Sequence, residues 1–224
     1  ARNQIGKNGS KAERDVKGEV QKIKQDWLAE WMPLLTSDET PINPYRIIWD
    51  LMHAVDRSQT IVTHDSGHPR DQMIPFYEAT TPRGYLGWAN SSQLGYGLGI
   101  AMGAKLGAPE KLVVNIMGDA AIGMAGMDIE TAVRHKIPIL TIVLNNHVLS
   151  GYSVNYPVAA ERYGFTNLYG EYADLAKALG AYSERVGDPQ QIVPAIGRAQ
   201  EAMATGKPAL IEFMTKEENN LSRY

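Results

Sequence analysis

From residue 44 to the C-terminus, short apolar runs alternate with amphipathic segments. Segments 111–117 (KLVVNIM) and 139–144 (ILTIVL) are almost continuously apolar, which is typical of strands buried on both faces of a parallel sheet. Four more segments fit strands: 60–67 (TIVTHDSG), 83–88 (RGYLGW), 181–186 (AYSERV) and 208–215 (PALIEFMT). This alternation predicts an α/β fold with a doubly wound, mainly parallel six-stranded sheet and helices on both faces.

The helices between these strands are predicted from apolar spacing and from their end signals. The first begins at Pro44 with Asn43 as its N-cap and continues through YRIIWDLMHAV. The others cover 94–107 (LGYGLGIAMGAKLG), 127–135 (MDIETAVRH), 172–180 (YADLAKALG) and 189–204 (PQQIVPAIGRAQEAMA). The small residues of 94–107 would let that helix pack close against the sheet.

Residues 1–43 differ from the rest of the chain. A polar, glycine-containing start is followed by apolar residues at helical spacing from Val16 to Trp31, and Pro33 is expected to end that helix. We interpret 1–43 as a connector or the tail of a preceding domain, and 44–224 as the main domain. The alternative is an ordinary N-terminal helix packed on its own domain.

Composition excludes several kinds of function. The chain has 224 residues, a formal net charge of −3 and no cysteine, so disulfides, thiolate metal sites and cysteine nucleophiles are ruled out. The small negative charge gives no reason to expect a nucleic-acid partner. No apolar run approaches the roughly 20 residues of a membrane span, and no signal peptide opens the chain. We therefore expect a cytoplasmic domain without membrane or nucleic-acid partners.

Polar residues follow the two most apolar strands. Asp119 comes just after the first, and Asn145 and Asn146 come just after the second. A right-handed crossover brings both strand ends to the carboxyl edge of the sheet, where open α/β sheets bind ligands. One carboxylate and one amide oxygen suit Mg²⁺, which takes few protein ligands and completes its shell with phosphate and water.

The turn after Asp119 suggests a phosphate cradle. Ala120, Ala121 and Gly123 leave backbone N–H groups uncovered ahead of a helix. Gly-Asp or Asn-Asn alone is as often a plain turn or loop. The segment lacks the Gly-Lys-Ser/Thr of a P-loop, and Met102 stands where a dinucleotide fingerprint needs its third glycine. Gly-Asp and Asn-Asn together, at the two ends of one βαβ unit, indicate a ligand site more specifically than either dipeptide alone.

The sequence GDA at 118–120 with NN at 145–146 resembles the thiamine-diphosphate-binding motif. From Pro41 onward, the chain is similar to the C-terminal, diphosphate-binding domain of the acetolactate-synthase-like (pyruvate oxidase and decarboxylase) group. The segments DETPINPYRIIWDLM, THDSGHPRDQM and LGYGLGIAMGAKLGAPEKLVVNIMGDA carry the resemblance. Ala120 replaces the motif's second glycine, and HPRD at 68–71 stands where that group often has Gln-His.

The resemblance implies a role for each matching residue. Asp119, the Asn146 side chain and the Val148 carbonyl would bind Mg²⁺. The N–H groups of Ala120 and Ala121, after Gly118, would hold the diphosphate. The remaining implied pocket residues are Ser66, Gly67 and His68 over the phosphates, Leu94 as the apolar support that bends the cofactor, the Ser92 carbonyl at its 4′-amino group, and Ser150 and Gly151 in the closing loop. For Leu94, the alternative is a plain helix-core residue.

The resemblance also implies a function: a thiamine-diphosphate-dependent lyase or transferase that decarboxylates or ligates 2-oxo acids. The group's activating glutamate lies on an N-terminal pyrimidine-binding domain, so no catalytic residue is assigned in this chain. We therefore expect a C-terminal fragment or separate subunit holding half of an active site, and a homo-oligomer (dimer or tetramer). FAD, used by some relatives, would sit on the absent region. The face around Gly95, Tyr96, Gly97, Gly99 and Met124 is expected to meet the partner.

Two other functions stay open. The chain could be a non-catalytic α/β module that binds a phosphate ligand in regulation or assembly. It could also be the small subunit of a two-chain oxidoreductase acting on 2-oxo acids. The joint presence of Asp119, Asn146, Leu94 and the Gly67 turn favours the enzyme, because a module without catalysis has no need for all of them.

Overall fold

The structure is a computed structural model that describes residues 15–87 and 93–222. The chain divides into two compact units, Ala1–Leu34 and Leu35–Tyr224. Helix α1 (Val16–Leu35) makes up nearly all of the described part of the first unit, and its last residue, Leu35, belongs to the second. This helix continues past Pro33, where we expected it to end, because a proline in the last turn removes only one backbone hydrogen bond.

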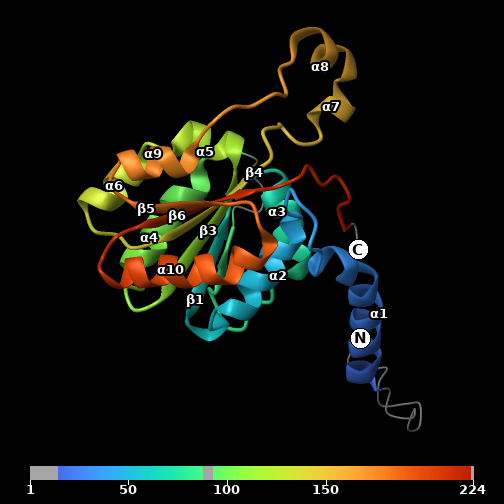
Figure 1. Ribbon diagram of the computed structural model, residues 1–224. Coiled ribbons are helices and arrows are strands. Elements are labelled where there is room, and N and C mark those ends of the chain that lie inside the picture. The colour runs from blue at the N-terminus through green and yellow to red at the C-terminus, as the bar shows by residue number, and fades with distance from the viewer. Residues whose placement is uncertain (1–14, 88–92, 223–224) are drawn as a thin grey trace, which may run out of the picture. The chain divides into compact units, whose positions relative to one another are not determined.

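The described part of the second unit is built on a six-stranded, fully parallel sheet (Figure 1). The strand order is β2-β1-β3-β4-β6-β5. The strands are β1 (Thr60–His64), β2 (Tyr85–Leu86), β3 (Leu112–Gly118), β4 (Leu140–Asn145), β5 (Tyr182–Val186) and β6 (Ala209–Met214). The predicted α/β fold and its six strands are confirmed. The strand order reverses between β1 and β3, which opens a crevice at their carboxyl ends.

Helices cover both faces of the sheet (Figure 1). One face carries α2 (Pro44–Ala54), α3 (His68–Phe76) and α10 (Ile192–Ala204). The other carries α4 (Tyr96–Gly107), α5 (Asp119–Ala125), α6 (Asp128–Arg134) and α9 (Tyr172–Ala178). The core under this second layer includes Leu98, Val113, Met117, Ile129 and Val143. Two single-turn helices, η1 (Arg57–Gln59) and η2 (Pro189–Gln191), precede β1 and α10.

Helix α2 starts as predicted. The Asn43 side chain accepts a hydrogen bond from the Tyr45 N–H at 3.0 Å, and Pro44 takes the first helical position. The compact unit nevertheless begins at Leu35, before the predicted boundary at 43/44. Leu35 and Ile42 are fully buried, and Ile42 forms a parallel bridge with Thr215. Residues 35–43 therefore pack with the main unit, whereas the role of the residues before them as a connector stays a prediction.

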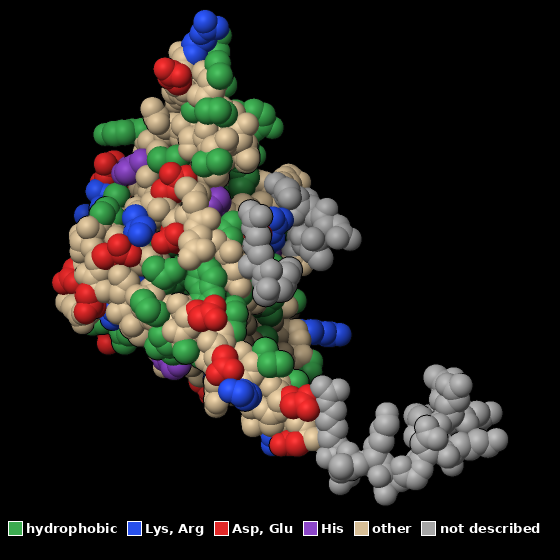
Figure 2. All heavy atoms as spheres, turned by 90° about the vertical axis from the view of Figure 1, so that its right-hand side faces the viewer, with side chains coloured by type: hydrophobic (Ala, Val, Ile, Leu, Met, Phe, Trp, Pro, Cys, Tyr) green, Lys and Arg blue, Asp and Glu red, His purple; other side chains and the backbone are tan. Residues whose placement is uncertain are grey.

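Two short helices, α7 (Tyr152–Asn155) and α8 (Pro157–Tyr163), form a projection beyond the sheet that we call the α7–α8 arm (Figure 1). The sequence analysis did not predict it. Its apolar side chains Val154, Val158 and Tyr163 are exposed. Figure 2 shows hydrophobic side chains on the surface of this projection, at the top of the view. None of the helices in the described part of the chain is long and apolar enough to cross a membrane.

Candidate cofactor site

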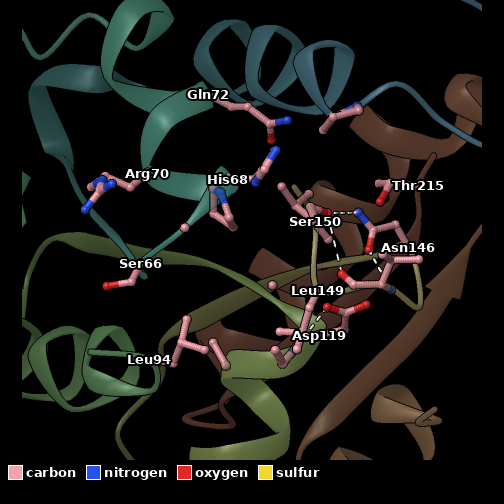
Figure 3. Close-up of a pocket in the computed structure, with 18 of the residues that line it drawn as sticks. Ser66, His68, Arg70, Gln72, Leu94, Asp119, Asn146, Leu149, Ser150 and Thr215 are labelled. Atoms are coloured by element: carbon pink, nitrogen blue, oxygen red, sulfur yellow. Dashed lines mark hydrogen bonds between the residues drawn. The ribbon is translucent and has the colours of Figure 1, made fainter. Parts of the chain in front are cut away.

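A cavity of about 320 Å³ lies at the carboxyl edge of the sheet, where β1, β3, β4 and β6 end (Figure 3). Most of the predicted site residues line it: Ser66, Gly67, His68, Leu94, Gly118, Asp119, Ala120, Ala121, Asn146, Val148 and Ser150. Gly151 directly follows Ser150, and its N–H donates to Glu217 Oε1 at 3.0 Å. Ser92 lies outside the described residues. The topology thus brings residues that are distant in the chain into one pocket, as the strand-end argument predicted.

Asp119 is the first residue of α5, immediately after β3, and its side chain is buried. Its Oδ1 accepts a hydrogen bond from the Ala120 N–H at 2.8 Å. Its Oδ2 is buried without a hydrogen-bond partner among the described residues. Burial raises the pKa of Asp119, and the nearby backbone N–H groups of Ala120, His147 and Asn146 offset part of the rise. A buried carboxylate oxygen without a partner needs an explanation, and a bound cation supplies one.

Asn146 directly follows β4, the neighbour of β3, so its side chain lies near Asp119 (Figure 3). Its Nδ2 donates to Ser150 Oγ at 2.7 Å, and its Oδ1 accepts from the Val148 N–H at 3.0 Å. These contacts fix which end of the amide is oxygen. An amide oxygen keeps a second lone pair, so Asn146 Oδ1 can still face a cation.

The donor set fits Mg²⁺ rather than a softer metal. It combines one carboxylate with an amide oxygen and the Val148 carbonyl, which are hard ligands. Among the described residues, no group of three or more His, Cys, Asp and Glu side chains could hold a metal ion. A cation at this edge would therefore be bound by few protein oxygens, and phosphate and water would fill its remaining positions.

The segment after Asp119 differs from its prediction. We expected residues 120–123 to form a turn with uncovered N–H groups ahead of a helix. Instead α5 begins at Asp119, so Ala120 and Ala121 lie in its first turn, where backbone N–H groups have no partner within the helix. The Ala120 N–H donates to Asp119 Oδ1, and its role toward phosphate stays a prediction. The role of the Ala121 N–H stays a prediction.

The opposite wall comes from the turn after β1. Ser66 donates its hydroxyl hydrogen to the Gln93 carbonyl at 2.9 Å, and His68 Nε2 lies 3.1 Å from Asn219 Oδ1. Leu94 lies in the turn before α4, so it is not a helix residue. It is half-buried, borders the cavity and packs against the core under α4. Leu94 therefore contacts both the cavity and the core, and its role as a support for the cofactor stays a prediction.

Asp65 holds this wall together, and the sequence analysis missed it. Its fully buried carboxylate accepts backbone hydrogen bonds from Ser66 at 2.8 Å, Gly95 at 3.0 Å and Gly97 at 3.0 Å. A Cβ at Gly97 would lie 2.6 Å from Asn115 Oδ1. Glycine is therefore required for this close approach. The signal in the sequence was a lone Asp directly after a buried strand.

The segment after β6 runs along the pocket and was also missed as a pocket element. Thr215 and Lys216 line the cavity, as do Arg70 and Gln72 of α3. Gln72 Nε2 donates to the Glu218 carbonyl at 3.3 Å. The two cations are paired, Arg70 with Asp71 and Lys216 with Glu39 and Glu218. This segment reaches the site because β6 pairs with β4 in the sheet, which its position in the sequence does not reveal.

The expected partner face is only partly free. Tyr96 and Gly97 are buried within the chain, because the start of α4 packs against β1 and Asp65. Met124 is exposed. The face expected around Gly95, Tyr96 and Gly97 is therefore corrected, because these residues contact the chain's own fold. Gly99 is exposed, and exposed apolar side chains include those of Met124, Met127 and the α7–α8 arm.

A family model and several curated relatives match most of this chain. Residues 65–213 match the family "Thiamine pyrophosphate enzyme, C-terminal TPP binding domain". An acetolactate synthase large subunit of Mycobacterium tuberculosis is 33% identical over 193 residues, covering 81% of this chain and 33% of the relative. A sulfoacetaldehyde acetyltransferase of Alcaligenes xylosoxydans xylosoxydans is 29% identical over 183 residues, covering 79% of this chain and 30% of the relative.

A solved structure shares the fold. The thiamine diphosphate-dependent 4-hydroxybenzoylformate decarboxylase of Rhodococcus jostii RHA1 superposes with a TM-score of 0.70 at 22% identity, over 82% of this chain and 34% of that chain. The chain spans about a third of the length of the curated relatives it matches. The chain therefore belongs to the thiamine pyrophosphate enzyme family, as a C-terminal thiamine pyrophosphate-binding domain that resembles acetolactate synthases over most of its length.

Proposed function

We propose that this chain forms the diphosphate- and Mg²⁺-binding half of the active site of an enzyme that decarboxylates or ligates 2-oxo acids. The observation that carries the proposal is the buried, unpartnered Oδ2 of Asp119, a residue that lines a cavity together with the family's expected residues. Asn146 Oδ1 and the Val148 carbonyl complete the proposed protein ligands of the ion. An acetolactate synthase-like reaction is supported by the relatives, whose names include acetolactate synthases and an acetyltransferase.

The chain's own residues would bind and orient rather than react. Thiamine diphosphate, when bound, supplies an electron sink for the bond-breaking step. Asp119 and Asn146 would hold the cation that bridges to the diphosphate. Leu94, between the cavity and the core, would fix the position of the thiazolium ring, and the turn at Ser66 would close over the phosphates. Fixed orientation of the reacting groups is a large part of the rate enhancement that a protein can supply.

The rest of the active site is proposed to lie on another region or subunit. The matched segment covers only about a third of each relative, so a pyrimidine-binding region with its activating glutamate would come from outside this chain. Exposed apolar side chains on the α7–α8 arm and at Met124 support a partner or a homo-oligomer, because such surfaces are usually covered. Cytoplasmic location and FAD on the additional region belong to the same proposal.

The test is calorimetric titration of the 224-residue chain with thiamine diphosphate, with and without Mg²⁺. We expect binding that requires Mg²⁺ and that is lost in Asp119→Ala. Asp128→Ala, which removes an exposed first-turn carboxylate of α6, is the matched control and should bind like the parent. Equal affinity of Asp119→Ala and the parent, with or without Mg²⁺, would contradict the proposed site.

A second measurement separates a half-site from a complete enzyme and from a non-catalytic module. We expect the chain alone to bind thiamine diphosphate but not to release carbon dioxide from pyruvate. Turnover by a monomeric chain would refute the half-site. Equal affinity for inorganic diphosphate and thiamine diphosphate would favour the phosphate-binding module instead, because Leu94 would then contribute nothing.

A further inference from the structure

Glu212 is a charged residue in the middle of an otherwise apolar strand, β6, and it is fully buried. Its carboxylate lies beside Arg185 of the neighbouring strand β5, with which it is in register. Arg185 Nε donates to Glu212 Oε2 at 3.0 Å, and the Ala173 N–H donates to the same oxygen at 2.9 Å. Arg185 also forms an ion pair with Glu171. A buried carboxylate is tolerated because it is paired in this way.

The other oxygen of Glu212 points to the candidate site. Asn145 Nδ2, at the end of β4, donates to Glu212 Oε1 at 2.7 Å. An ionised carboxylate only accepts hydrogen bonds, so it selects the NH₂ end of the Asn145 amide. The Oδ1 end must then point the opposite way, and it accepts from the His147 N–H at 3.1 Å. The Gly170 carbonyl also accepts from Asn145 Nδ2, at 3.4 Å. Glu212, with the shorter contact, thus does most to orient an amide that holds the next loop.

This loop carries the proposed metal ligands. His147 adopts φ +59°, a left-handed conformation that is uncommon for a residue with a side chain. The hydrogen bond from its N–H to Asn145 helps to hold that conformation. Asn146 and Val148 lie on either side of His147, so the direction of the Asn146 side chain and of the Val148 carbonyl depends on it. The contact at Glu212 therefore acts on the ligands without touching the ion.

We propose that Glu212 is a positioning residue for the metal-binding loop, acting through Asn145 on Asn146 and Val148. This inference rests on the proposed function, because it assumes that the loop binds Mg²⁺. Hydrogen-bonding partners behind a metal's direct ligands typically change metal affinity by about 10–100-fold when they are removed. Glu212 stands one contact further out, because it acts through Asn145 and the His147 N–H, so we expect an effect at the lower end of this range.

The isosteric variant Glu212→Gln tests the orientation directly. Arg185 and the Ala173 N–H would hold the oxygen of the new amide, so its NH₂ group would face Asn145 Nδ2. A flip of Asn145 would avoid this contact, but it would place the NH₂ group against the His147 N–H and the amide oxygen against the Gly170 carbonyl. Contacts are lost in either orientation, so we expect the Mg²⁺ concentration that supports half-maximal thiamine diphosphate binding to rise about tenfold. Because the defect lies in metal binding, saturating Mg²⁺ should restore most of the thiamine diphosphate affinity.

The double variant Glu212→Gln with Asn145→Asp should rescue the defect. The new carboxylate on β4 would accept from both the new amide on β6 and the His147 N–H, so these two contacts and the number of charges are kept, and only the longer contact with the Gly170 carbonyl is lost. Asn145→Asp alone opposes two buried carboxylates and should bind Mg²⁺ more weakly than Glu212→Gln or the double variant. Arg198→Gln is the structural control: it removes the ion pair with Glu184 of β5, outside this network, and should leave the Mg²⁺ requirement unchanged.

The outcomes distinguish this inference from the proposed function. A parent chain that shows no Mg²⁺-dependent binding of thiamine diphosphate refutes both. A parent that binds, together with a folded Glu212→Gln variant of equal Mg²⁺ requirement, refutes only the positioning role, as does a double variant that shows no rescue. If Glu212→Gln does not fold, Asn145→Ala removes the same contact from the loop side. Parental Mg²⁺ requirement in folded Asn145→Ala would then overturn the inference.

Discussion

The Asp65 carboxylate accepts a hydrogen bond from the backbone N–H of Gly97 at 3.0 Å, which joins the end of β1 to the first turn of α4. The same carboxylate accepts from the Ser66 and Gly95 N–H groups. Ser66 and Leu94, on one wall of the candidate pocket, are thus held in place by one buried side chain. The shape of the site depends on this contact as much as on the residues that face the cavity.

Gly97→Ala should therefore destabilise the chain, and Gly99→Ala should not. A methyl group at Gly97 meets Asn115 Oδ1 and the Asp65 carboxylate, so we expect a loss of about 1–3 kcal/mol in the free energy of unfolding. At Gly99, two residues further along α4, nothing lies within 4 Å, so alanine should stabilise the helix by up to about 1 kcal/mol. Urea unfolding of both variants measures the difference. Similar effects of the two substitutions would show that Asp65 does not approach α4 this closely.

Leu94→Ala should affect binding more than stability. Leu94 is half-buried and borders the cavity, whereas Leu98 of α4 is fully buried in the same core. Leu98→Ala should cost about 2–5 kcal/mol, and Leu94→Ala clearly less. Calorimetry on the folded fraction of each variant should show weaker thiamine diphosphate binding for Leu94→Ala and parental binding for Leu98→Ala. If Leu94→Ala costs as much stability as Leu98→Ala and binds normally, Leu94 is a core residue only.

The buried side chain of His64 should make the folded chain less stable in weak acid. Its ring is buried at the end of β1, and burial lowers the pKa of His64 from its ordinary 6.5. The folded chain therefore binds this proton less readily than the unfolded chain does. The stability that comes from neutral His64 is present above about pH 6.5 and is lost as the pH falls through the lowered pKa. Arg70 adds to the shift through its positive charge.

The variant His64→Gln removes this proton-binding group. Its thermal midpoint should start lower than that of the parent, because the contact with the Tyr96 hydroxyl changes. Between about pH 7 and about pH 5 it should then fall less steeply with pH than the parent's midpoint. Parallel midpoint curves for the two proteins would show that His64 is not the group responsible.

The sequence predicts the strands and the Asp119–Asn146 pair because both follow local rules. Apolar runs identify buried strands, and parallel strands place their ends at one edge. Helices α7 and α8 were missed because neither buries a side chain, so neither has an apolar stripe, and α3 was missed because it contains Pro69 and Pro75. Helix α6, as short as α8, was predicted because its apolar residues follow a helical spacing. Length and period are the signals on which helix prediction depends.

Asp65 and Glu212 could not be assigned because their partners are distant in the chain. Asp65 binds N–H groups some 30 residues away, and Glu212 binds Asn145, 67 residues earlier. Glu212 nevertheless left one signal, since a charge inside an apolar strand is seldom buried without a partner. That partner, Arg185, stands at the matching register of the neighbouring strand.

The most direct test of the central claim is the position of the metal. Crystals of the chain with thiamine diphosphate and Mn²⁺, an anomalous scatterer that substitutes for Mg²⁺, locate the ion independently of any activity. The account predicts an anomalous peak at the end of β3 and β4, in contact with Asp119 Oδ2, Asn146 Oδ1 and the Val148 carbonyl. A peak elsewhere, or cofactor bound in the cavity without an ion at Asp119, would contradict it.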